Sequence, residues 1–159
     1  MFNVYISHSV SPVELAQVYA LAEDATRQGL RPTIPHRQWS PNGPLPADLQ
    51  SSLKKSQAML LFVTTLGQYD DWVNTEVREM GNKHLVALIE EGVQLSGVPP
   101  ENTVRFSRFG NFANAVDVAT NRLRHLGLKK QNENLLAGLL IGGLVLLLAR
   151  GLEGKGGGD

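Results

Sequence analysis

Glu76 is the acidic residue of this sequence that is best placed to do chemistry. Residues 58–65 form a continuous apolar run, which is typical of a buried parallel strand, and Glu76 lies in the helical pattern that follows. Ligands of open α/β sheets bind in the crevice at the carboxyl ends of the strands. We therefore expect the Glu76 carboxylate to face that crevice beside Trp72, four residues earlier on the same helix face. The alternative is a solvated glutamate in the first helical turn, which the helix dipole favours.

Strand and helix patterns alternate along the first 126 residues of the chain. Short apolar stretches that predict strands cover residues 2–6, 30–35, 58–65, 84–89 and 104–106. Helical patterns cover residues 12–28, 47–55, 71–81 and 111–126. This alternation predicts an α/β fold in which a central parallel sheet of about five strands carries helices on both faces.

Proline and glycine mark the ends of several elements. Ser11 and Pro12 begin the first helix, with Glu14 placed as in a capping box, and Gly29 ends it. The prolines of the second strand indicate a position at the edge of the sheet. Residues 38–46 contain three prolines and one glycine, so they predict a long turn-rich loop before the next helix.

Composition excludes several classes of function. The chain has 159 residues, enough for one domain and an appendage, and its formal net charge of zero argues against nucleic-acid binding. It has no cysteine, hence no disulfide or thiolate metal site, and its four histidines lack metal-ligand spacing. Neither GxGxxG nor GxxxxGK occurs, so the usual dinucleotide and phosphate loops lack support. The strand pattern at the N-terminus predicts no cleavable signal peptide.

The C-terminal part of the chain predicts a membrane helix. Residues 135–149 are an uncharged apolar run of 15 residues, and Arg150 and Leu152 extend it if the arginine reaches the interface. A full span needs about 20 residues, so this transmembrane helix, placed over 135–152, is short. A core helix is the alternative, but such a helix should keep a polar stripe, which this run lacks.

Flanking residues give the membrane helix an orientation. Four basic residues precede the run and two follow it, so the positive-inside rule leaves the domain formed by residues 1–126 in the cytoplasm of a single-pass protein of the inner cell membrane. Residues 127–134 are the expected linker, and the glycine-rich tail 153–159 should be disordered. Gly138 and Gly142 form a GxxxG pair, which permits self-association in lipid.

Three landmarks stand in the order found in TIR (Toll/interleukin-1 receptor) domains. Residues 4–9, Val-Tyr-Ile-Ser-His-Ser, resemble the opening box of that family, and residues 38–46 lie where the family has its BB loop. Residues 71–76, Asp-Trp-Val-Asn-Thr-Glu, resemble its W-x-x-x-E stretch. Over residues 1–126 the chain thus resembles TIR domains, in particular the bacterial TIR-like proteins of antiphage defence. The resemblance implies a flavodoxin-like fold.

The resemblance also implies an activity. In members of the family that cleave NAD+, the glutamate of the W-x-x-x-E stretch is catalytic, which gives Glu76 that role, with NAD+ as substrate and no resident cofactor. One fixed carboxylate suffices chemically, because bond breaking spreads positive charge over the ribose and nicotinamide is a good leaving group. His36 and Arg37 could contact the pyrophosphate. Asp70 and Asp71 are nearby, where a helix cap and turn explain them.

Four further residues are candidate substrate contacts. Ser7 and Ser9 could donate hydrogen bonds to a ribose or phosphate, or could form an ordinary turn and cap. Trp72 could line the ribose pocket or anchor its helix to the sheet. Trp39, in the predicted loop, could stack on a base, cover the pocket or contact a neighbouring subunit.

Functions of different classes remain open from the sequence. The first is a membrane-anchored NAD+ glycohydrolase or ADP-ribosyl cyclase that acts in bacterial immune defence. The second is a non-catalytic TIR module that self-associates through the loop and the membrane helix. A nucleoside deoxyribosyltransferase-like N-glycosidase is a third, since such folds also use one glutamate near the strand ends.

Overall fold

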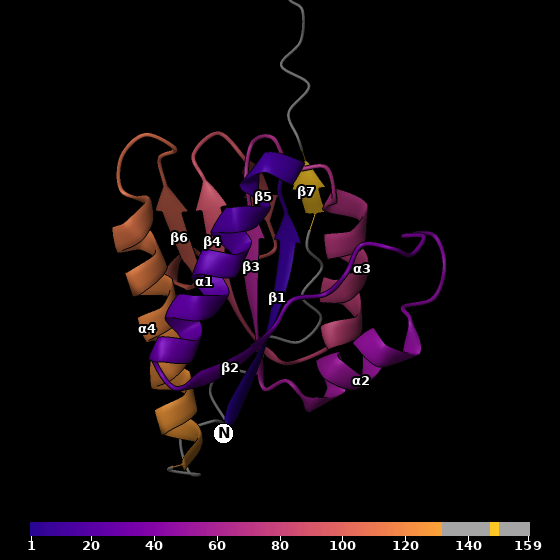
Figure 1. The fold of residues 1–159 in the computed structure, drawn as a ribbon, viewed down its shortest axis with the longest axis horizontal. Helices are drawn as coiled ribbons and strands as arrows, with labels where there is room; N and C mark the ends of the chain where they lie inside the picture. The colour runs from indigo at the N-terminus through magenta and orange to yellow at the C-terminus, as the bar shows by residue number, and fades with distance from the viewer. Residues whose placement is uncertain (132–146, 150–159) are drawn as a thin grey trace, which may run out of the picture.

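A five-stranded parallel sheet lies at the centre of the fold (Figure 1). The computed structural model describes residues 1–131 and 147–149. The strands follow the spatial order β2-β1-β3-β4-β6. Their bounds are β1 (Phe2–Ser9), β2 (Leu30–Thr33), β3 (Ala58–Val63), β4 (His84–Glu90) and β6 (Thr103–Phe106). The predicted α/β fold with a parallel sheet is thereby confirmed.

Helices cover both faces of this sheet (Figure 1). On one face lie α1 (Leu15–Arg27), which follows a short 3₁₀ turn η1 (Pro12–Glu14), and α4 (Phe112–Gln131). On the other face lie α2 (Ala47–Lys55) and α3 (Asp70–Met80). The strand order and the two helical layers are those of a flavodoxin-like fold.

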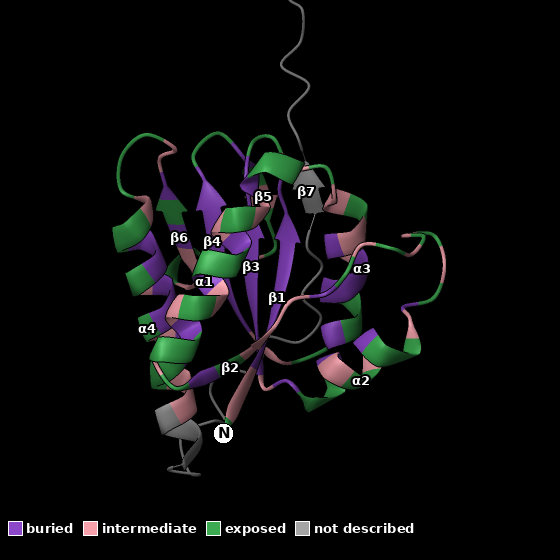
Figure 2. Ribbon diagram, in the orientation of Figure 1, coloured by how far each residue is buried: buried purple, intermediate pink, exposed green. Residues whose placement is uncertain are grey.

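The central strand β3 is buried along its whole length (Figure 2). Successive side chains of a strand point to opposite faces, so Phe62 packs with α1 and α4 while Met59 packs with α2 and α3. A strand that is covered on both faces reads as a continuous apolar run. This is why the sequence predicts its position so well.

Several element boundaries differ from the sequence-based expectation. β1 continues through Ser9, because its polar end pairs with the apolar end of β3, His8 with Phe62 and Ser9 with Val63. α4 continues to Gln131, into the expected linker.

Two short elements, β5 (Gln94–Ser96) and η2 (Pro100–Asn102), were not predicted, since three residues are too few to show a period. β2 is an edge strand, as its prolines indicate.

Most of the predicted membrane helix, 135–152, lies outside the described residues. Its residues Leu147–Ala149 are described, and they form strand β7, which pairs antiparallel with β5. The helix expectation is therefore corrected at these three residues, where the backbone groups of β5 supply hydrogen-bond partners across the strand pair. Within the described part of the chain, no helix is long and apolar enough to cross a bilayer.

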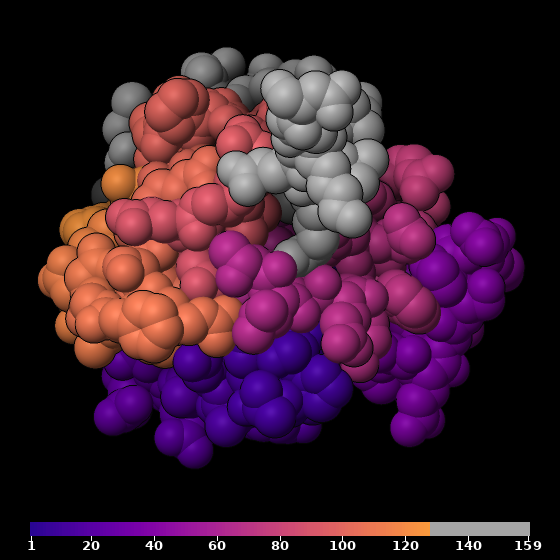
Figure 3. Space-filling view, turned by 90° about the horizontal axis from the view of Figure 1, so that it is seen from above, coloured from indigo at the N-terminus to yellow at the C-terminus, as the bar shows by residue number. Residues whose placement is uncertain are grey.

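An ion-pair network connects the loops at the carboxyl edge of the sheet. Figure 3 views the molecule from this side. Arg108, in the loop after β6, pairs with Glu14 at 2.9 Å and with Glu90 at 3.0 Å. The Glu14 carboxylate also accepts hydrogen bonds from the Ser11 N–H and the Thr64 hydroxyl, each at 2.8 Å. Burial raises the pKa of Glu14, but these hydrogen bonds and the charge of Arg108 together lower it below its ordinary value.

Replacing Arg108 by methionine should destabilise the fold. The substitution leaves two buried carboxylates, Glu14 and Glu90, without their shared cation. Because the Arg108 side chain keeps some exposure, we expect a loss of about 2 kcal/mol in the free energy of unfolding, less than for a fully buried pair. Urea unfolding measures it, with Arg124→Met, an exposed position on α4, as the matched control. Equal unfolding midpoints for the two variants would contradict the prediction.

Candidate active site around Glu76

Glu76 lies on the buried face of α3 and has no exposed surface. Helical spacing puts it there, because Val73 three residues before it and Met80 four residues after it both pack against the sheet. The alternative of a solvated glutamate in the first helical turn is therefore wrong. The carboxylate faces the strand β1 instead of opening directly into the crevice at the carboxyl edge.

Two hydroxyl groups of β1 donate hydrogen bonds to the Glu76 carboxylate. Tyr5 donates to Oε2, and Ser7 donates to Oε1 at 2.8 Å. The alternation of the strand puts both side chains on the face that α3 covers. Burial, reinforced by the negative charge and the hydrogen bond of Glu76, raises the pKa of Tyr5, so the phenol keeps its proton and remains a donor.

Arg37 supplies the positive charge of the site. Its Nη2 lies 2.8 Å from Glu76 Oε1 and also donates to the carbonyl oxygen of His8 at 2.8 Å. Arg37 comes from the segment that connects β2 to α2, and its side chain is only 8% exposed. The pair is therefore a buried salt bridge, in which the hydroxyls of Tyr5 and Ser7 complete the hydrogen bonding of the carboxylate.

Aromatic side chains form the wall beside the ion pair. The guanidinium carbon of Arg37 lies 5.7 Å from the centre of the Tyr69 ring, and that ring meets Trp72 edge to face with centroids 5.4 Å apart. The indole N–H of Trp72 donates to the carbonyl oxygen of Trp39 at 2.8 Å. Trp72 thereby links α3 to the loop of residues 38–46, a contact that differs from both of its predicted roles, lining the ribose pocket and anchoring the helix to the sheet.

The indole of Trp39, in the predicted loop, is partly buried. It packs against the apolar cluster shared by β1, β3, α2 and α3, and donates its N–H to the carbonyl oxygen of His36 at 3.0 Å. His36 in turn contacts Asp48 on α2 at 3.1 Å. The loop around Trp39 is therefore packed onto the domain in this structure.

The predicted substrate contacts Ser7 and Ser9 have different surroundings. Ser7 reaches Glu76, whereas the hydroxyl of Ser9 donates to Asp70 at 2.5 Å and accepts the N–H of Tyr69 at 3.0 Å. Ser9 thus joins the end of β1 to the beginning of α3, which corresponds to the turn-and-cap alternative. Sequence reasoning missed Tyr5, although the Tyr5-x-Ser7 alternation on a predicted strand was available as a clue.

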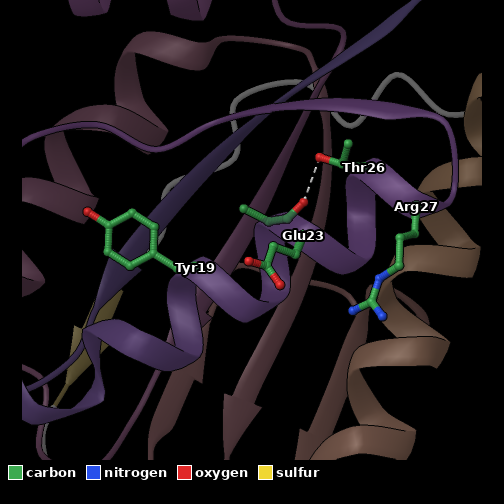
Figure 4. A pocket seen from close by; sticks show the side chains of 5 residues that line it. Tyr19, Glu23, Thr26 and Arg27 are labelled. Carbon is green, nitrogen blue, oxygen red and sulfur yellow. Dashed lines mark hydrogen bonds between the residues drawn. The ribbon is translucent and has the colours of Figure 1, made fainter.

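Other parts of the described chain are less suited to binding a ligand than the surroundings of Glu76. No group of three or more histidine or acidic side chains that could hold a metal ion occurs among the described residues. A hollow on the outer side of α1 is lined by Tyr19, Glu23, Thr26 and Arg27 (Figure 4). These four side chains are exposed, so their charges lie in a medium of high dielectric and are poorly suited to catalysis.

Comparisons with protein-family models and with curated proteins find no match to this chain. Among solved structures, it is similar to RosB with bound 8-demethyl-8-formylriboflavin-5'-phosphate, with a TM-score of 0.57 at 10% identity over 84% of this chain and 81% of that one. It is also similar to NAD(P)H:quinone oxidoreductase from Methanothermobacter marburgensis, with a TM-score of 0.38 at 12% identity over 79% of this chain and 97% of that one. The likeness to RosB shows a shared α/β fold of the flavodoxin-like kind.

His8 should make stability depend on pH. Burial and the neighbouring charge of Arg37 lower the pKa of His8 from 6.5 to about 4, so the folded protein holds the ring neutral where the unfolded chain takes up a proton. Stability is then full above about pH 6.5 and is lost as the pH falls toward 4. Between pH 7 and pH 5 we expect His8 to account for a loss of about 2 kcal/mol in the free energy of unfolding.

Urea unfolding at the two pH values tests this assignment. The variant His8→Asn should show a smaller loss than the wild type, whereas His125→Asn, at an exposed position of α4, should not differ from it. If the wild type and His8→Asn lose equal stability between pH 7 and pH 5, the dependence does not come from His8.

Proposed function

We propose that this protein cleaves the bond between nicotinamide and ribose in NAD+, with Glu76 as the catalytic carboxylate. The observation that supports this best is one fully buried carboxylate fixed by two hydroxyl donors, Tyr5 and Ser7. Such a group is pre-organised, so it need not reorient when positive charge develops beside it. The resemblance of residues 71–76 to the W-x-x-x-E stretch of NAD-cleaving TIR domains supports NAD+ as the substrate.

The reaction needs no second acid. The bond between the ribose carbon and the pyridinium nitrogen breaks, and both of its electrons go to nicotinamide, which leaves as a neutral molecule. The ribosyl carbon becomes electron-deficient, and Glu76 stabilises that charge in a medium of reduced dielectric. Water then forms the new carbon–oxygen bond and loses one proton to solvent, which gives ADP-ribose. In bacteria, depletion of NAD+ by this route would serve antiphage defence.

Each contact of Glu76 has a part in this scheme. Ser7 and Tyr5 hold the two carboxylate oxygens in place. Arg37 pairs with the carboxylate in this structure, so it must leave Glu76 before the ribose can take its place. The aromatic wall of Tyr69 and Trp72 lies beside the position that Arg37 would vacate.

Glu76→Gln should lower the rate of nicotinamide release by about a hundredfold or more, which is the scale of losing one pre-organised electrostatic contact. The measurement is nicotinamide release from NAD+ by purified full-length protein. Glu79→Gln, one turn further along α3 and exposed, is the matched control and should keep wild-type activity. Because Glu76→Gln leaves Arg37 without its anion, circular dichroism must show that the variant folds.

Glu76→Asp provides a second variant that keeps the charge. It withdraws the carboxylate by one methylene group, so we expect activity between that of the wild type and that of Glu76→Gln. Wild-type turnover in a folded Glu76→Gln protein would overturn the assignment of Glu76.

One observation favours a non-catalytic assembly module as the second candidate. Glu76 has no exposed surface, and its carboxylate is already engaged by Tyr5, Ser7 and Arg37, as in a structural clip between α3 and β1. The same assay separates the two candidates. An assembly module releases no nicotinamide at any protein concentration, while sedimentation velocity shows self-association of the full-length chain.

The membrane location stays a prediction based on residues 135–149. The full-length protein should fractionate with membranes and resist carbonate extraction. Leu140→Arg should release it, because a charge near the centre of a span is costly, whereas Leu140→Ile should not. Recovery of the wild-type chain in the soluble fraction without detergent would contradict the anchor.

A further inference from the structure

We propose that Arg37 recognises a phosphate group of the ligand, so that the site takes phosphorylated nucleotides and discriminates against free nucleosides. This inference rests on the cleavage reaction proposed above and names its substrate class. Three observations support this inference: the unpaired N–H groups of a buried guanidinium, the ion pair that covers Glu76, and the aromatic ring beside the guanidinium.

Two nitrogens of the Arg37 guanidinium have no hydrogen-bond partner among the described residues. Nη2 contacts both Glu76 and the His8 carbonyl oxygen, whereas the buried Nε and Nη1 donate to no group in the described part of the chain. The side chain is 8% exposed, so these N–H groups are shut off from bulk water, and leaving them unpaired costs free energy. Phosphate oxygens accept from arginine in pairs, and each two-donor edge of a guanidinium includes Nη2, so a phosphate that engages Nε or Nη1 in this way also competes for the Nη2 group that now contacts Glu76.

The ion pair holds Glu76 in a form that cannot act on a ribose. The guanidinium cancels much of the field of the carboxylate and covers Oε1. A pyrophosphate or phosphomonoester is a better partner for Arg37 than a carboxylate that already has two hydroxyl donors. Transfer of Arg37 from Glu76 to the phosphate therefore frees the carboxylate as the ligand binds, and part of the binding free energy of the phosphate is used at the reacting centre.

The surroundings of Arg37 allow this transfer with little movement of the backbone. The face of the Tyr69 ring, 5.7 Å from the guanidinium carbon, is a surface on which the planar group can turn. The backbone that follows Arg37 is held to α3 by the hydrogen bond from Trp72 to the carbonyl oxygen of Trp39. We therefore expect the side chain to turn while the loop stays attached.

Substrate discrimination tests the proposal. The wild type should cleave NAD+ and nicotinamide mononucleotide with a much higher kcat/KM than nicotinamide riboside, which lacks the phosphate. Arg37→Gln should lower the ratio of kcat/KM for the mononucleotide over the riboside by between about tenfold and a hundredfold, the range for losing a charge-assisted hydrogen bond. Arg37→Lys keeps the charge without the planar fork, so its kcat/KM ratio should lie between those of the wild type and Arg37→Gln. Arg31→Gln, at an exposed position of β2, removes a cation beside the beginning of β1 and should leave the ratio unchanged.

A binding measurement gives a readout that needs no catalysis. The chain has two tryptophans, Trp39 and Trp72, and both belong to the surroundings of Arg37, so their emission reports on this site. Inorganic pyrophosphate should change the tryptophan emission of the wild type and of Arg31→Gln in a saturable way, and that of Arg37→Gln far less.

The two measurements separate failure of this inference from failure of the proposed function. If nicotinamide is released but the preference for the mononucleotide is the same in wild type and Arg37→Gln, phosphate recognition by Arg37 is overturned while the cleavage reaction stands. If pyrophosphate binds in an Arg37-dependent way but no substrate is cleaved, the reaction is overturned while recognition stands. Pyrophosphate binding of equal strength in wild type and a folded Arg37→Gln variant overturns the recognition outright.

Discussion

A carboxylate without exposed surface must be compensated inside the protein, and in this fold the compensation of Glu76 links three distant parts of the chain. Strand β1 provides the hydroxyls, the segment after the edge strand β2 provides Arg37, and α3 carries the carboxylate itself. A change in the register of β1 by one residue would turn both hydroxyls to the other face of the sheet. The site is thus a consequence of the sheet as a whole, because the register of β1 fixes the positions of both hydroxyls.

The same residues explain why Glu76 is shielded from solvent. Tyr69 and Trp72 follow the end of β3 and pack against each other, and Trp72 binds the backbone of the loop that carries Trp39. The loop contributes its own indole to the apolar cluster under α2 and α3. The loop, the two aromatic side chains and the ion pair pack together, and among the described residues the buried Nε and Nη1 of Arg37 lack a hydrogen-bond partner there.

Most of the fold follows from the sequence, whereas most of the site does not. The apolar run of β3, the helix of residues 47–55 and the parallel sheet were all predictable, because each depends on a local period or on the alternation of elements. The position of Glu76 on α3 was predictable in the same way. Its pairing with Arg37 was not, since the two are far apart in sequence and meet only through the packing of an irregular loop. β5 and β7 are too short for their periodicity to be read.

The ion-pair network at the carboxyl edge has a consequence for where any ligand can go. Flavodoxin-like folds generally seat a ligand phosphate at the turn after the first strand. In this chain the Glu14 carboxylate already accepts the hydrogen bond of the Ser11 N–H at that turn. Thr64 and Arg108 also bind the same carboxylate. Because the Glu14 carboxylate is part of the same chain, its effective concentration at the Ser11 amide is very high. A dissolved anion therefore competes with it poorly. A ligand phosphate therefore cannot bind the Ser11 amide unless it first displaces the Glu14 carboxylate.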